Sequence, residues 1–441
     1  MITNKGLCFS GITINIRKVI SYFFFFLYFC SLTIYANTFN NTIIIFGLLS
    51  CFFIFILNLK KVEYSISSYI GVFVITLTSQ INYLLPYSIV NFIFLLILFR
   101  KKILNSINKP LVMMFLFVGC IGISIVNSVE PELAKEAFVA FSVSIIIYYS
   151  ITLLSQSAIN LEDLYWFSCL FIVGMILVFF LNHSIQDLAK THRALIYFIG
   201  NSGTRSNTLA GYIAILLFIS VGCWRHNKSL LRKIVAISCF FSMCIILYFI
   251  ISRGAYLGIA VSLIPLLLFN VSKRRFLIIN SISIFILLFM IFFSKEIFDS
   301  RAFGLSTGDY SNGRWEYYRL AIEQFKIHPL IGNGMYQFGF LAGMNRLEDP
   351  HNWLLAYLTG IGIIGTMFFC LFLFPLLKKI FEVFISKNTD KKLIALAQAI
   401  TVPIIHGLVE PAMSTSLPFM LFCILSPILY NYKPNRETNN F

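Results

Sequence analysis

Long apolar stretches with almost no charge recur along most of the sequence, and they constrain the fold more than any other feature. About fourteen of them have the length and apolarity of membrane-spanning helices. Some, such as 64–84 and 86–99, are short and closely spaced, so twelve crossings fit as well. The sequence therefore predicts an all-α integral membrane protein with about 12–14 transmembrane helices. The stretches lie at about 19–35, 42–58, 64–84, 86–99, 110–127, 136–153, 163–181, 208–223, 234–251, 255–271, 276–293, 352–376, 393–408 and 412–430.

The overall composition leads to the same class of protein. Of 441 residues, 59% are hydrophobic and only 12% are charged, with a mean hydropathy of +0.85. A soluble domain of this length has no interior large enough for so much apolar surface, so lipid must be the solvent for most of it. The first stretch lacks a small-x-small cleavage site after Tyr35, which indicates an uncleaved first span. We found no internal repeat, and we expect residues 1–441 to form a single polytopic membrane domain.

The net charge of +16 reflects membrane topology. If the N-terminus is cytoplasmic and each span crosses, clusters such as Arg100–Lys102 and Lys273–Arg275 fall on the cytoplasmic side, as the positive-inside rule requires. We therefore expect cytoplasmic termini, and we expect no nucleic-acid partner. The ten cysteines are scattered in or near the apolar spans without a CxxC pair, which argues against disulfides and structural zinc.

The segment 294–351 is the longest polar interruption, and the topology places it outside the cytoplasm. Loops this long between membrane helices are usually functional. Within it, we expect a helix that Asn312 caps and Pro329 ends, lying along the outer membrane surface. One stripe of this helix is polar (Glu316, Arg319, Glu323, Lys326), and another is apolar (Trp315, Tyr318, Ile322, Phe325). We expect the segment to cover an active site.

Four residues near the starts of outer-side helices are the candidate site residues: Arg205, Arg253, Arg314 and His351. Helix N-termini favour anions, and the forked guanidinium of arginine matches phosphate oxygens. The pattern indicates a site for a phosphate or pyrophosphate ligand. For His351, we expect Asp349 to cap a helix that begins at Pro350, which would keep the imidazole neutral and able to accept a proton.

Each candidate also has an ordinary structural interpretation. Interfacial arginines usually anchor a helix at lipid headgroups, and for Arg205 this is the favoured reading. Arg314 pairing with Tyr318, or His351 capping its own loop through Asp349, would also be structural. Arg253 is harder to explain in this way because it lies in a very short turn.

Other outer-side residues are weaker candidates. His406 and Glu410 flank another outer turn, where a local pair at a helix end is favoured over a role in the site. Arg193 and Asn201 stay undecided. The outer loops contain neither a DxD motif nor a convincing acidic pair, and the sequence lacks a GxxxxGK[ST] loop, so we predict neither a metal nor a cofactor. The spans also carry few charges, which weakens an ion-coupled transporter.

Three segments, in this order, resemble the O-antigen ligase and polymerase family: SRGAYLG (252–258), NGRWEYYRLAIEQFKIHPLIGNG (312–334) and DPHNWLLAYLTGIGIIG (349–365). The shared module covers about 201–365. The resemblance implies a C-type membrane glycosyltransferase fold and a glycan donor on undecaprenyl pyrophosphate at the periplasmic face. It also implies metal-independent, inverting transfer.

By position in these motifs, the resemblance assigns two kinds of role. Arg253 and Arg314 match pyrophosphate-binding arginines, with Arg205 near a further basic position. His351 matches the histidine that activates the acceptor hydroxyl.

The first functional prediction is an O-antigen ligase of the bacterial inner membrane, acting in lipopolysaccharide biosynthesis. It would move a glycan from undecaprenyl pyrophosphate onto lipid A–core oligosaccharide, with membrane lipids around it. The alternative is an O-antigen polymerase, which uses the same donor to extend a lipid-linked glycan. From another class, a lipid-linked oligosaccharide flippase is a remote alternative. The residues do not distinguish the two acceptors or identify the sugar.

Overall fold

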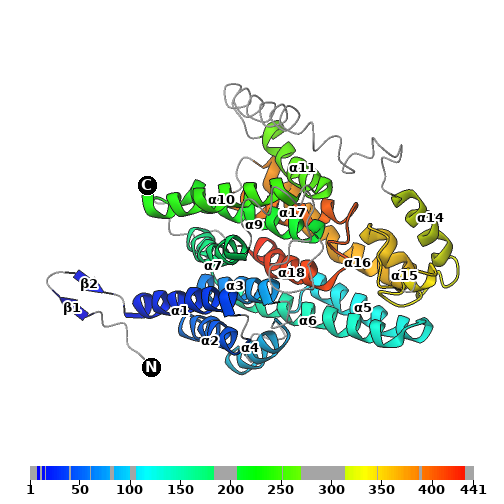
Figure 1. Cartoon of the computed structure of the whole chain (residues 1–441), viewed down its shortest axis with the longest axis horizontal. Helices are drawn as coiled ribbons and strands as arrows, with labels where there is room; N and C mark the ends of the chain where they lie inside the picture. The colour runs from blue at the N-terminus through cyan, green and yellow to red at the C-terminus, as the bar shows by residue number, and fades with distance from the viewer. Residues whose placement is uncertain are drawn as a thin grey trace.

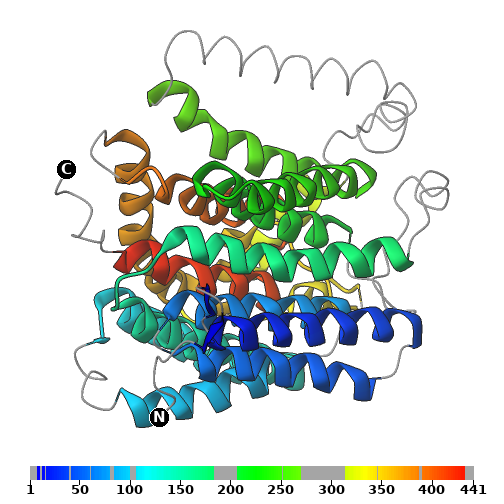
Figure 2. The same ribbon diagram turned by 90° about the vertical axis from the view of Figure 1, so that its left-hand side faces the viewer.

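The computed structural model describes residues 7–9, 12–14, 16–38, 41–59, 61–79, 84–99, 106–182, 206–250, 252–269, 313–344, 346–386 and 390–432. These residues form a bundle of helices that run side by side, most of them roughly parallel or antiparallel to one another (Figures 1 and 2). A short antiparallel hairpin precedes the bundle, with β1 (Leu7–Phe9) paired to β2 (Ile12–Ile14). Apart from this hairpin, the all-α prediction is confirmed.

Every predicted apolar stretch except 276–293, which lies outside the described residues, coincides with a helix. The closely spaced pair 64–84 and 86–99 forms two separate helices, and the last stretch begins later than predicted, at Ser416. The long helices are α1 (Ile16–Thr38), α2 (Asn41–Leu57), α3 (Val62–Ser79), α4 (Leu84–Leu98), α5 (Lys109–Ser124), α6 (Pro131–Ser155), α7 (Leu161–Asn182), α9 (Ser206–His226), α10 (Leu230–Ile250), α11 (Arg253–Phe269), α16 (Trp353–Ile385), α17 (Leu393–His406) and α18 (Ser416–Asn431).

The length and composition of these helices are those of a multi-pass membrane protein. Among the described residues, six helices are long and apolar enough to cross a membrane, and six further apolar helices are shorter. Large apolar side chains such as Phe26, Ile97 and Phe374 are more than 60% exposed on the outer faces of the bundle. In water such a surface would drive aggregation, whereas in a bilayer it contacts lipid. The six long segments are Lys109–Asn127, Pro131–Ser155, Leu161–Leu181, Asn207–His226, Leu230–Tyr248 and Trp353–Ile385.

Helix α16 is broken at Gly362, and a loop fills the break. Gly362 has φ 67° and ψ −172°, so the helical ladder is interrupted there. The loop 329–334 pairs with both sides of the break: Ile363 N donates to Pro329 O (2.8 Å), and Gly334 N donates to Gly360 O (2.9 Å). Irregular backbone inside a membrane protein is tolerated only where such partners satisfy it. The glycine-rich stretches IGNG and GIGIIG thus form one interlocked unit.

Two short helices flank this loop at one end of the bundle: α14 (Arg314–Phe325) and α15 (Phe338–Leu341) (Figure 1). Asn333 donates from Nδ2 to Gln324 O at 3.0 Å, which ties the loop to α14. Gln337 exchanges two hydrogen bonds with the backbone of Glu130, ahead of α6. These bonds fix α14 and the loop against α16 and α6, and so determine where the residues that follow can lie.

Candidate functional site

Glu410 lies at the centre of a cluster of polar side chains drawn from distant parts of the chain. Its carboxylate pairs with the guanidinium of Arg314 and accepts a hydrogen bond from Asn207 Nδ2 at 2.8 Å. Its Oε2 lies 3.3 Å from Nδ1 of His351. Glu410 is only 2% exposed. One buried carboxylate therefore joins α9, α14 and the segment that leads into α16.

The start of α16 explains why His351 and Glu410 meet. Asn352 caps α16, its side chain accepting from Leu354 N at 2.9 Å while Nδ2 donates to Leu408 O at 3.0 Å. Trp353 N donates to Gly407 O at 2.8 Å. The first turn of α16 is thus fastened to the segment that runs from α17 to Glu410. The prediction that Asp349 caps a helix beginning at Pro350 is wrong, because the side chain of Asn352 reaches the first N–H groups of α16.

His351 is held firmly, although it lies just before the helix rather than in its first turn. Its φ of 57° falls in the left-handed region, which few non-glycine residues adopt. Asp349 stabilises this conformation: Oδ1 accepts from His351 N, and Oδ2 accepts from Ser414 Oγ, both at 2.8 Å. The ring of Tyr317 stacks on the imidazole at 5.8 Å with an interplanar angle of 15°. Surrounding contacts of this kind are typical of side chains in functional sites, where the orientation of the side chain must be fixed.

The charge state of Glu410 follows from its neighbours. Burial alone would raise the pKa of this carboxyl, but the hydrogen bond with His351 and the charge of Arg314 outweigh burial, and the pKa is lowered. The group is therefore a carboxylate at neutral pH, and a carboxylate can only accept hydrogen bonds. It follows that the imidazole N–H of His351 is on Nδ1, which donates to Glu410. In the neutral imidazole, Nε2 then holds the lone pair.

Arg314 and Arg253 each occupy the first position of a helix, as the sequence indicated. Two details of the α14 prediction are wrong. The cap is Gly313, with φ 80° and no capping side chain, rather than Asn312; and the helix ends at Phe325, before Pro329. A glycine serves here because only glycine adopts this φ without strain.

The start of α11, where Arg253 lies, packs against Glu410 through Gly254. A Cβ on Gly254 would lie 3.0 Å from Cγ of Glu410 and 2.7 Å from Cδ2 of His406. The start of α11 therefore packs directly against the side chain of Glu410, whose carboxylate pairs with Arg314. The structure thus brings Arg314 and His351 together on Glu410 and places the start of α11 beside it, whereas Arg205 lies outside the described residues, as do Arg193 and Asn201.

Glu410 is not the local partner of His406 that the sequence favoured. The imidazole of His406 is fully buried between Gly211 and Gly254, and neither ring nitrogen has a hydrogen-bond partner among the described residues. Glu410 instead turns towards Arg314, Asn207 and His351. The sequence gives no sign of the contact between Asn207 and Glu410, because contacts across some two hundred residues leave no local pattern.

Two basic side chains, those of Arg232 and Lys392, lie near the opposite end of α9 from this site. Asn207, in the first turn of α9, contacts Glu410. The helix has 21 residues, so its other end is roughly 30 Å away, which is the thickness of a bilayer core. At that end Arg232 pairs with Asp163 (2.9 Å), and Lys392 pairs with Glu162 (2.8 Å).

Comparison with known proteins finds one family whose model matches part of the chain. Residues 238–370 match the model of the O-antigen ligase family, and this range contains Arg253, Arg314 and His351. Asn207 and Glu410 lie outside it. The comparison with curated proteins found no match. Residues 238–370 of this multi-pass membrane protein thus resemble an O-antigen ligase domain, which supports a glycosyltransferase-type role in lipopolysaccharide biosynthesis.

Proposed function

We propose that this protein is an O-antigen ligase. It moves a glycan from undecaprenyl pyrophosphate onto lipid A–core oligosaccharide at the periplasmic face of the inner membrane. The observation that carries the proposal is the Glu410 carboxylate, which joins Arg314, a residue suited to a pyrophosphate, to His351, a residue suited to a hydroxyl. One buried carboxylate thereby contacts both the residue proposed to bind the leaving pyrophosphate and the residue proposed to activate the acceptor hydroxyl.

On the donor side, Arg314 and Arg253 bind the pyrophosphate and stabilise the negative charge that develops on it as it leaves. Glu410 is bonded to one nitrogen of Arg314, Nη2, and a guanidinium has five N–H donors, so other donors remain for phosphate oxygens. Fixed donors that meet developing charge in a water-poor site contribute about 3–4 kcal/mol each. We propose that the arginines do what a metal ion does in many other glycosyltransferases. Arg205 would be a further substrate contact.

On the acceptor side, His351 is the general base. An acceptor hydroxyl attacks the anomeric carbon of the donor glycan and gives its proton to Nε2 of His351. The bond from that carbon to the phosphate oxygen breaks, and its electron pair leaves with the lipid pyrophosphate. Attack opposite the leaving group inverts the anomeric centre. Glu410 holds the Nδ1–H and stabilises the imidazolium that forms, a role known from catalytic triads.

The orientation in the membrane follows from the distribution of charge. Arg232 and Lys392 lie at the far end of α9 from the site, and basic clusters favour the cytoplasm. This supports a periplasmic site with cytoplasmic termini. Trp315 on α14 is 74% exposed, which supports an interfacial position for this helix, since tryptophan prefers the headgroup level.

A lipopolysaccharide gel tests the proposal. A deletion strain should show core without O-antigen and should accumulate lipid-linked polymer. The wild-type gene should restore the ladder, whereas a His351→Ala gene should not, although the protein is present in the membrane. Core that carries a single repeat unit would instead identify a polymerase. An unchanged ladder in the deletion strain, which must lack any second copy of the enzyme, would contradict both.

A further inference from the structure

An aromatic ring covers one face of the imidazole of His351, the proposed base. The ring of Tyr317 lies nearly parallel to the imidazole, with centroids 5.8 Å apart and an interplanar angle of 15°. This is the geometry of a stacked aromatic pair. A cation within about 6 Å of an aromatic centroid is attracted to the negative face of that ring. The contact therefore becomes stronger when His351 takes up a proton.

Helix α14 presents Tyr317 and Arg314 to the site together. The two residues are three positions apart, and residues at this spacing are neighbours on a helix surface. Arg314 pairs with Glu410, which in turn lies 3.3 Å from Nδ1 of His351. One turn further along α14, the ring of Tyr317 lies against His351 itself. The start of α14 thus supplies both the proposed anion-binding residue and a ring for the proposed base.

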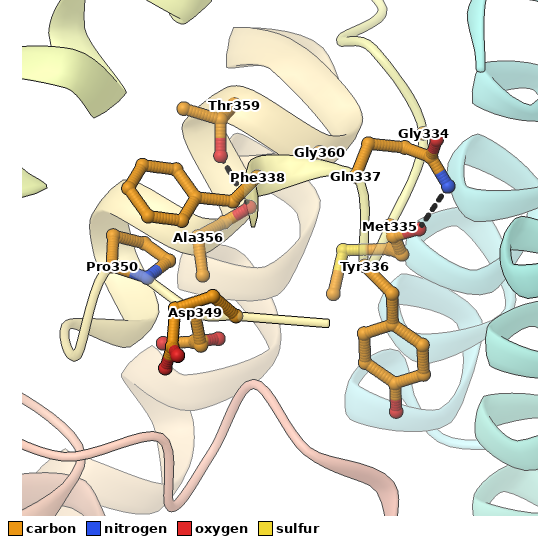
Figure 3. Close-up of a pocket in the computed structure, with 11 residues that line it drawn as sticks. Gly334, Met335, Tyr336, Gln337, Phe338, Asp349, Pro350, Ala356, Thr359 and Gly360 are labelled. Atoms are coloured by element: carbon orange, nitrogen blue, oxygen red, sulfur yellow. Dashed lines mark hydrogen bonds between the residues drawn. The ribbon is translucent and has the colours of Figure 1, made fainter. Parts of the chain in front are cut away.

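Packing supports the position of the Tyr317 ring. It contacts the ring of Phe338, with 5.7 Å between centroids and 59° between planes. Phe338 is buried, and it lines one small pocket together with Asp349 and Pro350, the residues that precede His351 (Figure 3). Phe338 and the segment that leads to His351 therefore belong to one packed unit. The stacking of Tyr317 on His351 does not depend on those two rings alone.

The charge that His351 gains as a base lies where water has little access, because its side chain is only 20% exposed. A cation–π contact is stronger at such a site than on an open surface. The charged and titratable groups around the imidazole are Glu410 (Oε2 3.3 Å from Nδ1), Glu348 (Oε1 3.7 Å from Nε2), Asp349, which accepts from His351 N, Arg314, which pairs with Glu410, and His406 and Tyr318, which lie near Glu410. A hydrogen-bond partner of a ring nitrogen lies near the plane of the ring, whereas Tyr317 covers a face.

We propose that Tyr317 is a positioning residue for the base: its ring holds the imidazole of His351 and stabilises the imidazolium that forms when Nε2 takes the acceptor proton. The inference rests on the proposed transferase function. It predicts two opposite effects when the ring is removed. The rate at neutral pH falls, because the developing imidazolium loses an attractive contact. Activity persists to lower pH, because His351 is then protonated less readily.

The pH profile of transfer by the purified full-length protein in lipid nanodiscs tests the inference. The probes are undecaprenyl-pyrophosphate-linked glycan as donor and lipid A–core as acceptor. Tyr317→Leu should lower the plateau rate roughly twofold to tenfold. It should also move the acid-side midpoint of the profile down by about half a pH unit to one unit. Tyr317→Phe keeps the ring face, so its profile should match that of the wild type.

A fluorinated ring separates electrostatics from packing. A trifluorinated phenylalanine at position 317 keeps the shape of the Tyr317→Phe side chain but weakens the negative face of the ring. It should therefore shift the acid midpoint downwards, as leucine does. The matched control is Trp315→Leu, which removes an exposed ring of α14 that packs edge-on against Tyr318. This control should leave the midpoint unchanged.

Chemical modification gives a readout that needs no transfer. Diethyl pyrocarbonate reacts with the neutral imidazole, and mass spectrometry of the peptide that contains His351 gives the pH at which half of the imidazole is protonated. This pH should shift in the same variants and by the same amount as the acid midpoint of transfer.

The outcomes distinguish the inference from the proposed function. A lower rate with an unchanged midpoint, in the leucine or the trifluorinated protein, would overturn the inference and leave the proposed function intact, because packing alone explains that result. If Tyr317→Leu fails to fold, the trifluorinated protein decides alone. A wild type that transfers no glycan, while the modification midpoint still shifts, would contradict the proposed function and support the contact between the ring and the charged imidazole.

Discussion

Oε2 of Glu410 lies 3.3 Å from Nδ1 of His351, although 59 residues separate the two in the chain. The segment that carries Glu410 is fastened to the start of α16 by the backbone bond from Trp353 to Gly407. The same carboxylate holds Arg314. His351 and Arg314, the proposed base and the proposed anion-binding residue, are therefore fixed relative to each other before any substrate arrives, and such preorganisation is a main source of catalytic power.

His351→Ala should lower the initial rate of glycan transfer by roughly 10²–10⁴-fold, the contribution of a positioned general base. In the proposed mechanism Nε2 takes the proton, and alanine removes this nitrogen. The rate is measured on purified protein with saturating donor and acceptor. His328→Ala is the control, since this histidine lies in the turn after α14 and is not among the described side chains that pair with the Glu410 carboxylate. A His351→Ala enzyme as fast as the His328→Ala enzyme would exclude the assigned role.

Arg314→Ala and Arg253→Ala should each abolish detectable donor turnover while the protein stays in the membrane. Loss of one such donor costs about 3–4 kcal/mol of transition-state stabilisation. Arg319→Ala is the matched control, because its exposed guanidinium pairs with Glu316 on the outer side of the same helix. Donor turnover and membrane content are measured together. Near-normal turnover in either variant would remove that arginine from the mechanism.

Glu410→Gln should slow transfer by roughly 10²-fold or more, since it removes the charge that orients His351 and pairs with Arg314. Glutamine keeps the shape of the side chain. A loss confined to acceptor or donor KM, with kcat unchanged, would argue against the orienting role.

The pH dependence of stability gives a second readout for Glu410. Because its pKa in the folded state is lowered, ionised Glu410 stabilises the fold above the usual glutamate pKa of about 4.3. That contribution is lost as the pH falls through the folded-state value. The melting temperature of the wild type should therefore exceed that of Glu410→Gln at pH 7, and the gap should shrink below about pH 4. A gap that does not change with pH would contradict the lowered pKa.

Gly362→Ala should destabilise the protein by at least about 1–3 kcal/mol, the usual cost of a left-handed conformation imposed on a residue that disfavours it. A Cβ at this position would also overlap the backbone of Leu330 in the loop that fills the break. Thermal melting in detergent measures the effect. Gly119→Ala is the control, because a Cβ there meets nothing within 4 Å and alanine favours a helix. Equal melting temperatures for the two variants would show that the break is not constrained.

The sequence predicted the helices better than the site. Apolar stretches identify membrane helices because a backbone in lipid must satisfy its own hydrogen bonds, which a helix does. All the predicted stretches within the described residues coincide with helices. Arg253 and Arg314 were found because each opens a helix, a pattern visible locally. Asn207 and Glu410 were missed or undervalued because their partners are remote in sequence. Asp349 followed by Pro350 is a strong local signal for a helix start, so the sequence predicted the cap at Asp349. Contacts between Asn352 and the segment after α17 place the cap at Asn352 instead.

The proposed function requires one site, centred on Glu410, to transfer a lipid-linked glycan to lipid A–core. Its most direct test is transfer in a purified system that contains only donor, acceptor and protein. The wild type should produce lipid A–core that carries the glycan and release undecaprenyl pyrophosphate, while Glu410→Gln and His351→Ala should produce almost none. Absence of product with the wild type, or undiminished product with both variants, would contradict the account.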